Sequence, residues 1–199
     1  MLNDIGIILL AAGSSNRLGE SKQLLPYKGK SLLKHAIQAA ELTEPAQLVV
    51  VLGANADEHF KEISDTAVSI TYNQNWERGI GSSISCGIQH LLHLMPETEA
   101  AIILLCDQPY LEAQVIENLI QKHKSTSKGI IACTYEETIG TPALFHKTYF
   151  SELKLLEGKQ GAKALFKQYE NDLATVEFPE GAIDIDTQED YLNLIKTNT

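Results

Sequence analysis

The sequence has no apolar run long enough to cross a membrane. Runs such as residues 7–12 hold only a handful of residues, whereas a transmembrane helix needs about 20. The first residues also lack the basic stretch and the cleavage site of a signal peptide. We therefore expect no export, no membrane contact and a cytoplasmic location.

Cysteine is scarce, and the chain contains no CxxC pair. Cys86, Cys106 and Cys133 lie far apart in apolar stretches, so we expect reduced thiols that pack as small hydrophobic side chains. His90 and His93 stand three residues apart, but the HExxH pattern is missing and no third ligand stands nearby. These absences argue against a zinc centre and a disulfide framework.

Basic charge is also in short supply. The 16 Lys and Arg residues stand against 26 Asp and Glu, a net charge of −10, which argues against general nucleic-acid binding because phosphate backbones need a basic face. Residues 1–35 reverse this balance, with Asp4 and Glu20 outnumbered by basic side chains. The basic residues there are Arg17, Lys22, Lys28, Lys30 and Lys34. A local positive patch on an acidic body fits a small polyanion.

The sequence does contain a regular alternation of apolar runs and segments with helical spacing. Compact runs rich in Ile, Leu and Val predict strands, most of them buried on both faces. They cover residues 5–11, 47–52, 68–72, 100–106 and 129–133, with further candidates at 141–145 and 173–178. Helices are predicted within residues 33–40, 84–95, 112–123, 147–156 and 160–170. We predict a single α/β domain over residues 1–199, with a mostly parallel twisted sheet and helices on both faces.

The end of the chain carries a helix start signal. Thr187 is followed three residues later by Asp190, a pattern that resembles a capping box. We therefore predict a last helix over residues 188–195.

The strongest functional signal is the segment after the first apolar run, where IILLAAGSSNRLGESKQLLP leads from a strand into small, polar and then basic residues. The predicted nucleotide-binding residues here are Leu10, Ala11, Ala12 and Gly13. Ala11, Ala12 and Gly13 leave the backbone open to a ligand, and consecutive N–H groups in such a loop can hold an anion. Arg17 and Lys22 can add charge to phosphate oxygens. The ligand that we expect is a nucleoside triphosphate (NTP).

Two familiar phosphate-binding motifs do not fit this segment. GxGxxG requires a glycine where Ser15 stands, and the Walker pattern requires four residues between its glycines, whereas five intervene and Glu20 follows. This argues against a dinucleotide enzyme and against a P-loop ATPase. A plain strand-to-helix turn with solvated basic residues is the alternative.

Acidic residues stand where an open α/β sheet collects its ligands. Asp107 in LLCDQP follows a buried strand, although Asp before Gln-Pro can also simply begin a turn. Asp184 and Asp186 in AIDIDT alternate as on a strand, so both point to the same side. Mg²⁺ prefers few carboxylates together with phosphate oxygens and water. One or two of these aspartates with a triphosphate would complete such a site, and one of the pair could instead stabilise the next helix N-terminus.

Small residues open one predicted helix, in the stretch GIGSSISCGI. Gly81, Ser82 and Ser83 would let a flat base approach the backbone, and Asn73, just past a strand, is a further nucleotide-binding candidate. An ordinary helix start with a serine cap is the alternative.

Five landmarks occur in order: AAGSSNRLG with KQLLP, YNQNWERGIGSSISCGI, LLCDQPYL, GTPALF and DIDTQEDY. Over nearly the whole chain they resemble the nucleotidyltransferases of molybdenum-cofactor maturation, especially the molybdopterin cytidylyltransferases. The resemblance implies the glycosyltransferase-A-like fold, also called nucleotide-diphospho-sugar transferase-like and Rossmann-like. It also implies that Asp107 and Asp186 hold magnesium and that the GIGSSISCGI stretch lines the base.

The resemblance also implies the substrates. The AAG loop is more similar to cytidylyl than to guanylyl enzymes, so CTP is favoured and GTP is the alternative. Molybdopterin is the implied acceptor. Thr141 stands where many relatives have His, and Lys159 where GDxGA would supply Asp, so a sugar phosphate or another phosphorylated alcohol stays open. Transient contact with a molybdoenzyme is expected, and a non-catalytic maturation partner that hands over the cofactor is the alternative of another class.

The predicted reaction is an in-line displacement at the α-phosphorus, with a terminal phosphate of the acceptor as nucleophile and pyrophosphate as leaving group. A phosphate monoester has a second pKa of about 6 and is mostly dianionic at neutral pH, so no activating His or Cys is needed. Arg17, Lys22 and Asp107 are then the predicted catalytic residues, which act by positioning and charge neutralisation.

Overall fold

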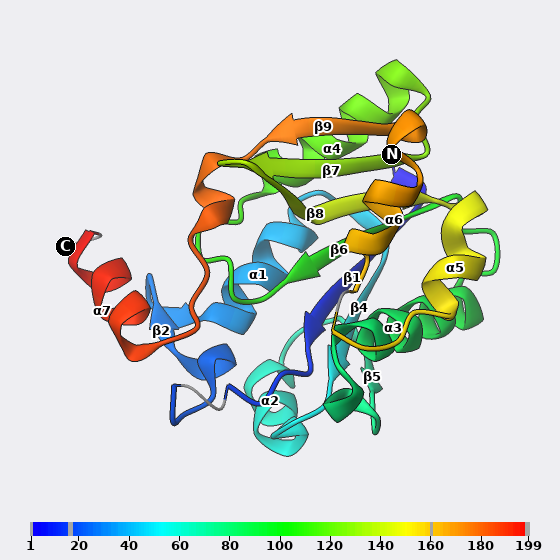
Figure 1. Ribbon diagram of the computed structural model, residues 1–199. Coiled ribbons are helices and arrows are strands. Elements are labelled where there is room, and N and C mark those ends of the chain that lie inside the picture. Colours follow the sequence, from blue (N-terminus) through cyan, green and yellow to red (C-terminus); the bar gives the residue numbers. More distant parts are fainter. Residues whose placement is uncertain (1, 16–17, 160, 198–199) are drawn as a thin grey trace.

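The computed structural model describes residues 2–15, 18–159 and 161–197 (Figure 1). A seven-stranded sheet with the order β5-β4-β1-β6-β8-β7-β9 forms its centre. The strands are β1 (Leu2–Ala11), β4 (Pro45–Leu52), β5 (Ser69–Tyr72), β6 (Ala100–Leu105), β7 (Ile130–Tyr135), β8 (Thr138–His146) and β9 (Leu173–Glu177). A separate hairpin consists of β2 (Pro26–Tyr27) and β3 (Lys30–Ser31).

Helices of different lengths surround the sheet. The α-helices are α1 (Leu32–Glu41), α2 (Ala56–Ile63), α3 (Ile80–Leu94), α4 (Ala113–Thr126), α5 (Phe150–Lys154), α6 (Lys163–Gln168) and α7 (Gln188–Thr197). Short 3₁₀ turns are η1 (Lys22–Leu24), η2 (Trp76–Arg78), η3 (Lys147–Tyr149), η4 (Glu170–Asp172) and η5 (Pro179–Ala182). Within the described ranges, no helix combines the length and the apolar character that crossing a bilayer requires.

Most of the sheet is parallel, as the sequence predicted. β1 pairs in parallel with β4 and β6, β4 with β5, and β7 with β9. Among the described strands of this sheet, β8 alone runs antiparallel, between β6 and β7. The predicted α/β class is confirmed.

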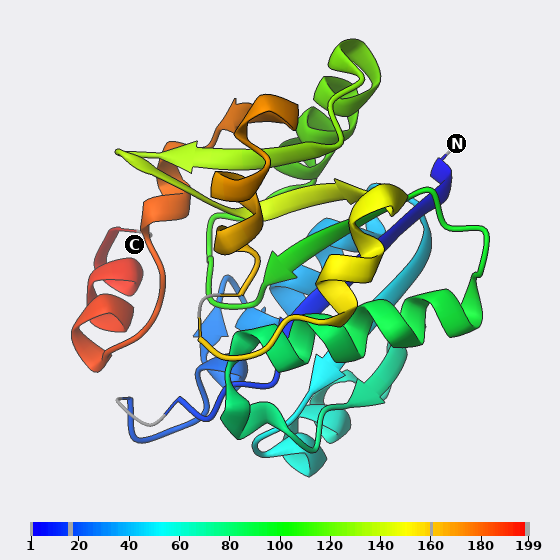
Figure 2. The ribbon, with the colours of Figure 1, turned by 45° about the vertical axis from the view of Figure 1, so that its right-hand side comes forward.

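Alternate residues of the central strands feed two hydrophobic cores. In β1, Ile7 and Leu9 belong to one buried cluster, and Ile8 and Leu10 belong to the other, because successive side chains of a strand point to opposite faces. Helices α1, α2 and α4 contribute to the first cluster, and α3, α5 and α6 contribute to the second (Figure 2). Both faces are therefore covered, which explains why the apolar runs show no polar alternation.

The structure also differs from the sequence-based expectations. Helix α2 and the β2–β3 hairpin were not predicted, and the apolar segment 141–145 is part of the longer strand β8. The segment around Asp184 and Asp186, expected to alternate as a strand, is not a strand. It lacks a neighbouring strand to pair with, so its extended backbone enters no ladder among the described residues.

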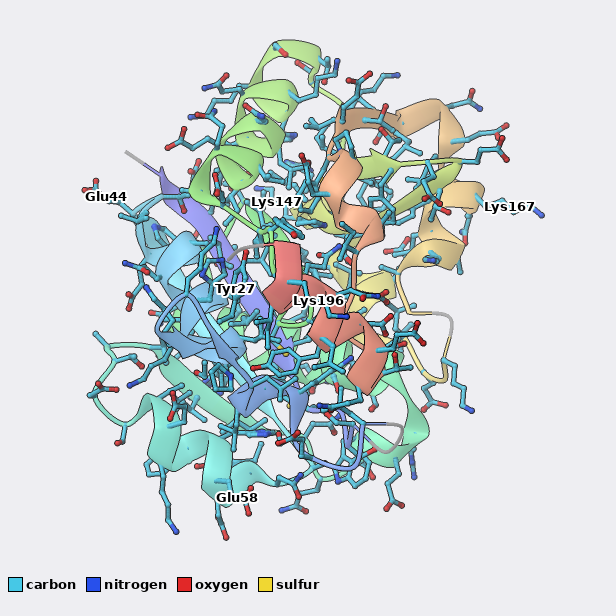
Figure 3. All side chains as sticks on the ribbon, turned by 90° about the vertical axis from the view of Figure 1, so that its left-hand side faces the viewer. Tyr27, Glu44, Glu58, Lys147, Lys167 and Lys196 are labelled. Carbon is cyan, nitrogen blue, oxygen red and sulfur yellow. The ribbon has the colours of Figure 1, made fainter. Side chains whose placement is uncertain are left out.

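A small third cluster fixes the C-terminal helix. Ile185, Tyr191 and Leu194 pack with side chains from the segment after β1, including Tyr27. The Tyr191 hydroxyl donates to the Pro26 carbonyl oxygen at 2.8 Å. Helix α7 therefore lies against the hairpin that carries Tyr27 (Figure 3).

The predicted capping box at the start of α7 is confirmed. Asp190 Oδ2 accepts from the backbone N–H and from the hydroxyl of Thr187, each at 2.7 Å, and Asp190 N–H donates to Thr187 Oγ1 at 3.2 Å. Asp190 Oδ2 also accepts from Asp186 N–H at 3.2 Å. The cap therefore holds the backbone of Asp186 as well as the helix end.

Candidate active site

The candidate site lies at the carboxyl ends of β1 and β6, which are neighbours in the centre of the sheet. Leu10 pairs with Leu105, so the chain leaves both strands at the same level. It continues to Gly13 on one side and to Asp107 on the other. Open α/β sheets bind their ligands at such an edge, in the crevice that the diverging loops leave.

Lys22 lies between two carboxylates in this crevice. Its Nζ is 2.6 Å from Asp107 Oδ2 and 3.0 Å from Asp186 Oδ1. The side chains of Lys22, Asp107 and Asp186 are 14%, 17% and 31% exposed. Burial alone would lower the pKa of Lys22, but the charge and the hydrogen bond of Asp107 outweigh burial and raise this pKa above its usual value. Lys22 is therefore a protonated cation at neutral pH.

The two carboxylate oxygens of Asp107 have different surroundings. Its Oδ1 is buried and finds no hydrogen-bond partner in the part of the chain that the structure describes, an arrangement that is costly unless a cation or donor joins it. No group of three or more His, Cys, Asp or Glu side chains in the described ranges is placed to hold a metal. Two aspartates fit an ion such as Mg²⁺, which takes few carboxylates and adds phosphate oxygens and water. Asp107 and Asp186 are the residues that would hold it.

Asp184 lies near the same cluster and lines the cavity next to it. Ile185, between the two aspartates, is fully buried, and its N–H donates to the Asp107 carbonyl oxygen at 3.0 Å. Asp184 lines a neighbouring cavity together with Asp107. Burial, followed by the charges of Asp107 and Asp186, raises the pKa of Asp184 above its usual value. Asp186 shares the ammonium group of Lys22 with Asp107, which favours it over Asp184 as the second metal ligand, a role that stays a prediction.

A cavity of about 600 Å³ opens beside the Lys22 cluster. The predicted site residues that line it are Leu10, Ala11, Ala12, Gly13, Lys22, Ser83 and Asp107. The structure therefore brings the loop after β1, the lysine and the aspartate to one place. Arg17, also predicted to contact phosphate, lies outside the described residues.

A buried glutamine that the sequence analysis did not single out holds the loop after β1. Gln23 is 1% exposed, and its Nε2 donates to the carbonyl oxygens of Gly13 at 2.8 Å and of Ala11 at 3.3 Å. A single polar residue between a lysine and two leucines shows no pattern that distinguishes it from a surface residue. Its place in the KQLLP landmark was the one signal in the sequence that could have pointed to Gln23.

The remaining nucleotide-binding candidates, at and near the start of α3, do not all line the same cavity. Asn73 Nδ2 donates to the hydroxyl oxygens of Ser82 at 2.9 Å and Ser83 at 3.0 Å. Asn73 and Ser82 line a separate cavity of about 650 Å³, and Ser83 lines the cavity beside Lys22. Gly81 packs against a loop, since a Cβ there would come within 2.7 Å of the Glu157 carbonyl carbon. Contact of Asn73, Gly81 and Ser82 with a nucleotide stays a prediction.

A larger cavity of about 920 Å³ adjoins the first one. Its walls include Gln108, Tyr135, Thr141 and Asp184, and basic side chains line it at Lys159, Lys163 and Lys167. The residues shared by both cavities are Ile80, Leu105, Asp107 and Lys159. The two cavities therefore share one acidic and one basic residue in their linings.

The loop that carries Lys159 is docked on the start of α3. Gly81 N–H donates to the Gly158 carbonyl oxygen at 3.0 Å. Gly79 has a φ of 107°, and a Cβ there would come within 2.6 Å of the same oxygen, so only glycine permits this close approach. Lys159 itself is exposed, and its backbone is held at the junction of the two cavities.

Sequence comparisons connect this geometry to known proteins. A family model described as MobA-like NTP transferase domain matches residues 7–173. "Nicotine blue oxidoreductase" of Paenarthrobacter nicotinovorans is 27% identical, over 94% of this chain and 95% of that protein. "Bifunctional protein GlmU" of Burkholderia ambifaria is 24% identical over 90% of this chain, which spans 39% of that longer protein.

Solved structures share the fold over almost the whole chain. Rv0371c from Mycobacterium tuberculosis has a TM-score of 0.84 and 28% identity, with 98% of this chain and 99% of that chain covered. A structure of Rv0371c in complex with manganese has a TM-score of 0.78 and 24% identity, with the same coverage. Molybdopterin-guanine dinucleotide biosynthesis protein A from Archaeoglobus fulgidus has a TM-score of 0.68 and 15% identity, with 98% and 100% covered.

Proposed function

This chain belongs to the MobA-like NTP transferase family and is a nucleotidyltransferase, and on that premise we propose that it transfers CMP from CTP to the phosphate of molybdopterin, with Mg²⁺. The resemblance predicted from the sequence is confirmed at the level of this family. The nucleotide base, the acceptor and the metal ion are our proposals.

The observation that carries the proposal is the meeting of two cavities at Asp107. The smaller cavity is lined by the loop after β1, by Lys22 and by Ser83, and we assign the NTP to it. The larger cavity has three lysines and three acidic residues in its lining and apolar walls at Ile84 and Phe166, and we assign the phosphorylated acceptor to it. An α-phosphorus near Asp107 would then face an acceptor phosphate from the adjoining cavity.

The proposed reaction is an in-line displacement. An oxygen of the acceptor phosphate forms a bond to the α-phosphorus, and the bond from the α-phosphorus to the bridging oxygen of pyrophosphate breaks. Lys22 would donate to phosphate oxygens and neutralise developing charge, and the loop after β1 would orient the triphosphate. Asp107 and Asp186 would hold the divalent ion, which when bound stabilises negative charge on the phosphate oxygens.

The choice of CTP rests on the loop after β1, whose AAG sequence is similar to the cytidylyl enzymes. The name of the Archaeoglobus structure raises GTP as the alternative base. The same name supports molybdopterin as the acceptor, whereas Thr141 and Lys159 depart from the usual pattern and both line the acceptor cavity. A sugar phosphate or another phosphorylated alcohol is therefore the alternative acceptor.

Release of pyrophosphate tests the proposal directly. Each of the four NTPs is incubated with the chain and Mg²⁺, in the presence and absence of molybdopterin. We expect release with CTP only when molybdopterin is present. Release with GTP alone among the NTPs would correct the base. Binding of molybdopterin without pyrophosphate release from any NTP would favour a non-catalytic maturation partner.

A further inference from the structure

His59 is a fully buried histidine with no part in the proposed chemistry. It lies on α2 (Figure 1), a helix that contacts η1, while the neighbouring Glu58 points to solvent (Figure 3). Its Nε2 is 2.5 Å from Ser21 Oγ. Burial of an imidazole costs free energy unless its nitrogens are hydrogen-bonded, so the contact with Ser21 is the main compensation available to this side chain.

The direction of each hydrogen bond from His59 onward follows from the two carbonyl groups at the far end. The carbonyl oxygens of Ala11 and Gly13 can only accept, so the amide nitrogen of Gln23 must face them. The amide oxygen of Gln23 then faces Ser21 and accepts from its hydroxyl at 2.8 Å. Since that hydroxyl has only one proton, His59 must donate to Ser21 through Nε2–H.

The same series of donors fixes the tautomer of His59. With the proton on Nε2, the other ring nitrogen Nδ1 is an acceptor, and it is buried without a partner among the described residues. A second proton on the ring would bury an unpaired N–H group and a charge. Burial lowers the pKa of His59, and the nearby Glu58 opposes this only in part. The site therefore holds the neutral Nε2–H form.

We infer that His59 is a positioning residue for the loop that binds the triphosphate, and that it acts through Ser21 and Gln23 on the backbone of Ala11 and Gly13. The inference rests on the proposed function, because it concerns how the same site binds its nucleotide. His59 touches neither the NTP cavity nor the Lys22 cluster in the contacts that the structure describes.

A second branch connects this network to the catalytic lysine. Ser15 Oγ also donates to the amide oxygen of Gln23 at 3.1 Å, and it accepts from the backbone N–H of Lys22 at 3.1 Å. Ser21 and Gln23 are the chain neighbours of Lys22. The network therefore fixes the loop after β1 and the backbone of Lys22 together, on two sides of one cavity.

The test compares variants that keep or remove the donor at position 59. Binding of CTP and GTP with Mg²⁺ is measured by titration calorimetry, and the KM values for NTP and acceptor are measured in parallel. His59→Phe fills the space without a donor and should raise the Kd of the NTP about tenfold, with the acceptor KM unchanged. His59→Gln supplies an amide N–H and should restore the Kd to within about threefold. Lys61→Ala, an exposed change on α2, is the control and should bind as the wild type.

A double-mutant cycle separates positioning from mere packing. If His59 acts through Ser21, then Ser21→Ala raises the Kd of the NTP, and adding His59→Phe to Ser21→Ala raises it less than about twofold further. Effects that multiply, or an unchanged Kd in a His59→Phe variant that melts like the wild type, would overturn the inference. If His59→Phe does not fold, the Kd values of Ser21→Ala and His59→Gln still test the inference, because the first removes the link and the second keeps a donor at position 59. If the wild-type chain binds NTP but releases no pyrophosphate, the proposed function is wrong. The double-mutant cycle still tests the inference in that case, because it measures NTP binding and not turnover.

Discussion

At the scale of single residues, Asp107 differs from an ordinary ion-pair partner in how the described part of the chain engages its two oxygens. Oδ2 binds Lys22, and Oδ1 is buried and meets no donor within residues 2–15, 18–159 and 161–197. Asp107→Asn keeps the shape and removes the charge, so we expect a folded protein whose Mg²⁺-dependent kcat falls about 100- to 1000-fold. Pyrophosphate release with a Mg²⁺ titration measures this. Asp65→Asn, which removes an exposed carboxylate paired with Lys34, should retain activity, and normal turnover by Asp107→Asn would remove Asp107 from the site.

The second prediction for a single residue concerns Lys159. It lines both cavities near the place where the proposed transfer would concentrate negative charge, and its side chain is long enough to bring its charge there. Lys159→Ala should lower kcat about tenfold, and Lys159→Arg should retain most of it because the charge stays. Steady-state kinetics with both substrates decide this. Lys124→Ala, an exposed change on α4, is the control, and equal rates for the Ala and Arg variants would show that the charge of Lys159 has no role.

At the scale of elements, the cap of α7 links helix stability to the position of Asp186. Asp190 Oδ2 accepts from the backbone N–H of both Thr187 and Asp186. Asp190→Ala should cost about 1 kcal/mol and also weaken Mg²⁺ activation, because the backbone of Asp186 loses its support. Thermal melting and a Mg²⁺ titration of activity measure the two effects.

The matched control for the α7 cap is the cap of α1. Ser31 Oγ accepts from Lys34 N–H at 3.1 Å, and its loss in Ser31→Ala should cost a similar free energy with the Mg²⁺ response unchanged. Asp190→Asn keeps an acceptor and should lie close to the wild type. A Mg²⁺ response that shifts equally in Asp190→Ala and Ser31→Ala would show that only general stability is involved.

The elements that the sequence predicted well are those that leave a local pattern, either a continuous apolar run or a helix start signal. The central strands are buried on both faces and α7 begins at a capping box, so each left a plain pattern. Helix α2 left none, because its buried side chains are His59 and Ile63 while Phe60 is 44% exposed. The antiparallel direction of β8 depends on a two-residue turn at Glu136 and Glu137, which lacks the Gly or Asn that marks such turns.

The site residues that could be predicted from the sequence are those marked by their own neighbours in the chain. The loop after β1 and Asp107 each follow a buried strand, and parallel neighbours bring such ends together. The contact of Lys22 with Asp186 joins residues that are far apart in the chain and was not predicted. The resemblance to a family indicated only that Asp186 belongs to the site. Gln23 and His59 act from within the core, and a buried polar residue has no periodic signal.

At the scale of the whole molecule, distant parts of the chain build the NTP cavity. The loop after β1, η1, the start of α3 and the end of β6 all line it, so a bound nucleotide connects them and should stabilise the folded state. A ligand at 100 times its Kd adds about 2.7 kcal/mol to the free energy of unfolding, and for a chain of this size that corresponds to a rise in Tm of about 5–10 °C.

We expect CTP with Mg²⁺ to produce this shift in Tm and EDTA to remove most of it. In Asp107→Asn, CTP should give the same small shift with and without Mg²⁺, and Asp65→Asn should respond as the wild type does. A full shift in the presence of EDTA would mean that the nucleotide binds without the metal, and that Asp107 and Asp186 serve only to hold Lys22.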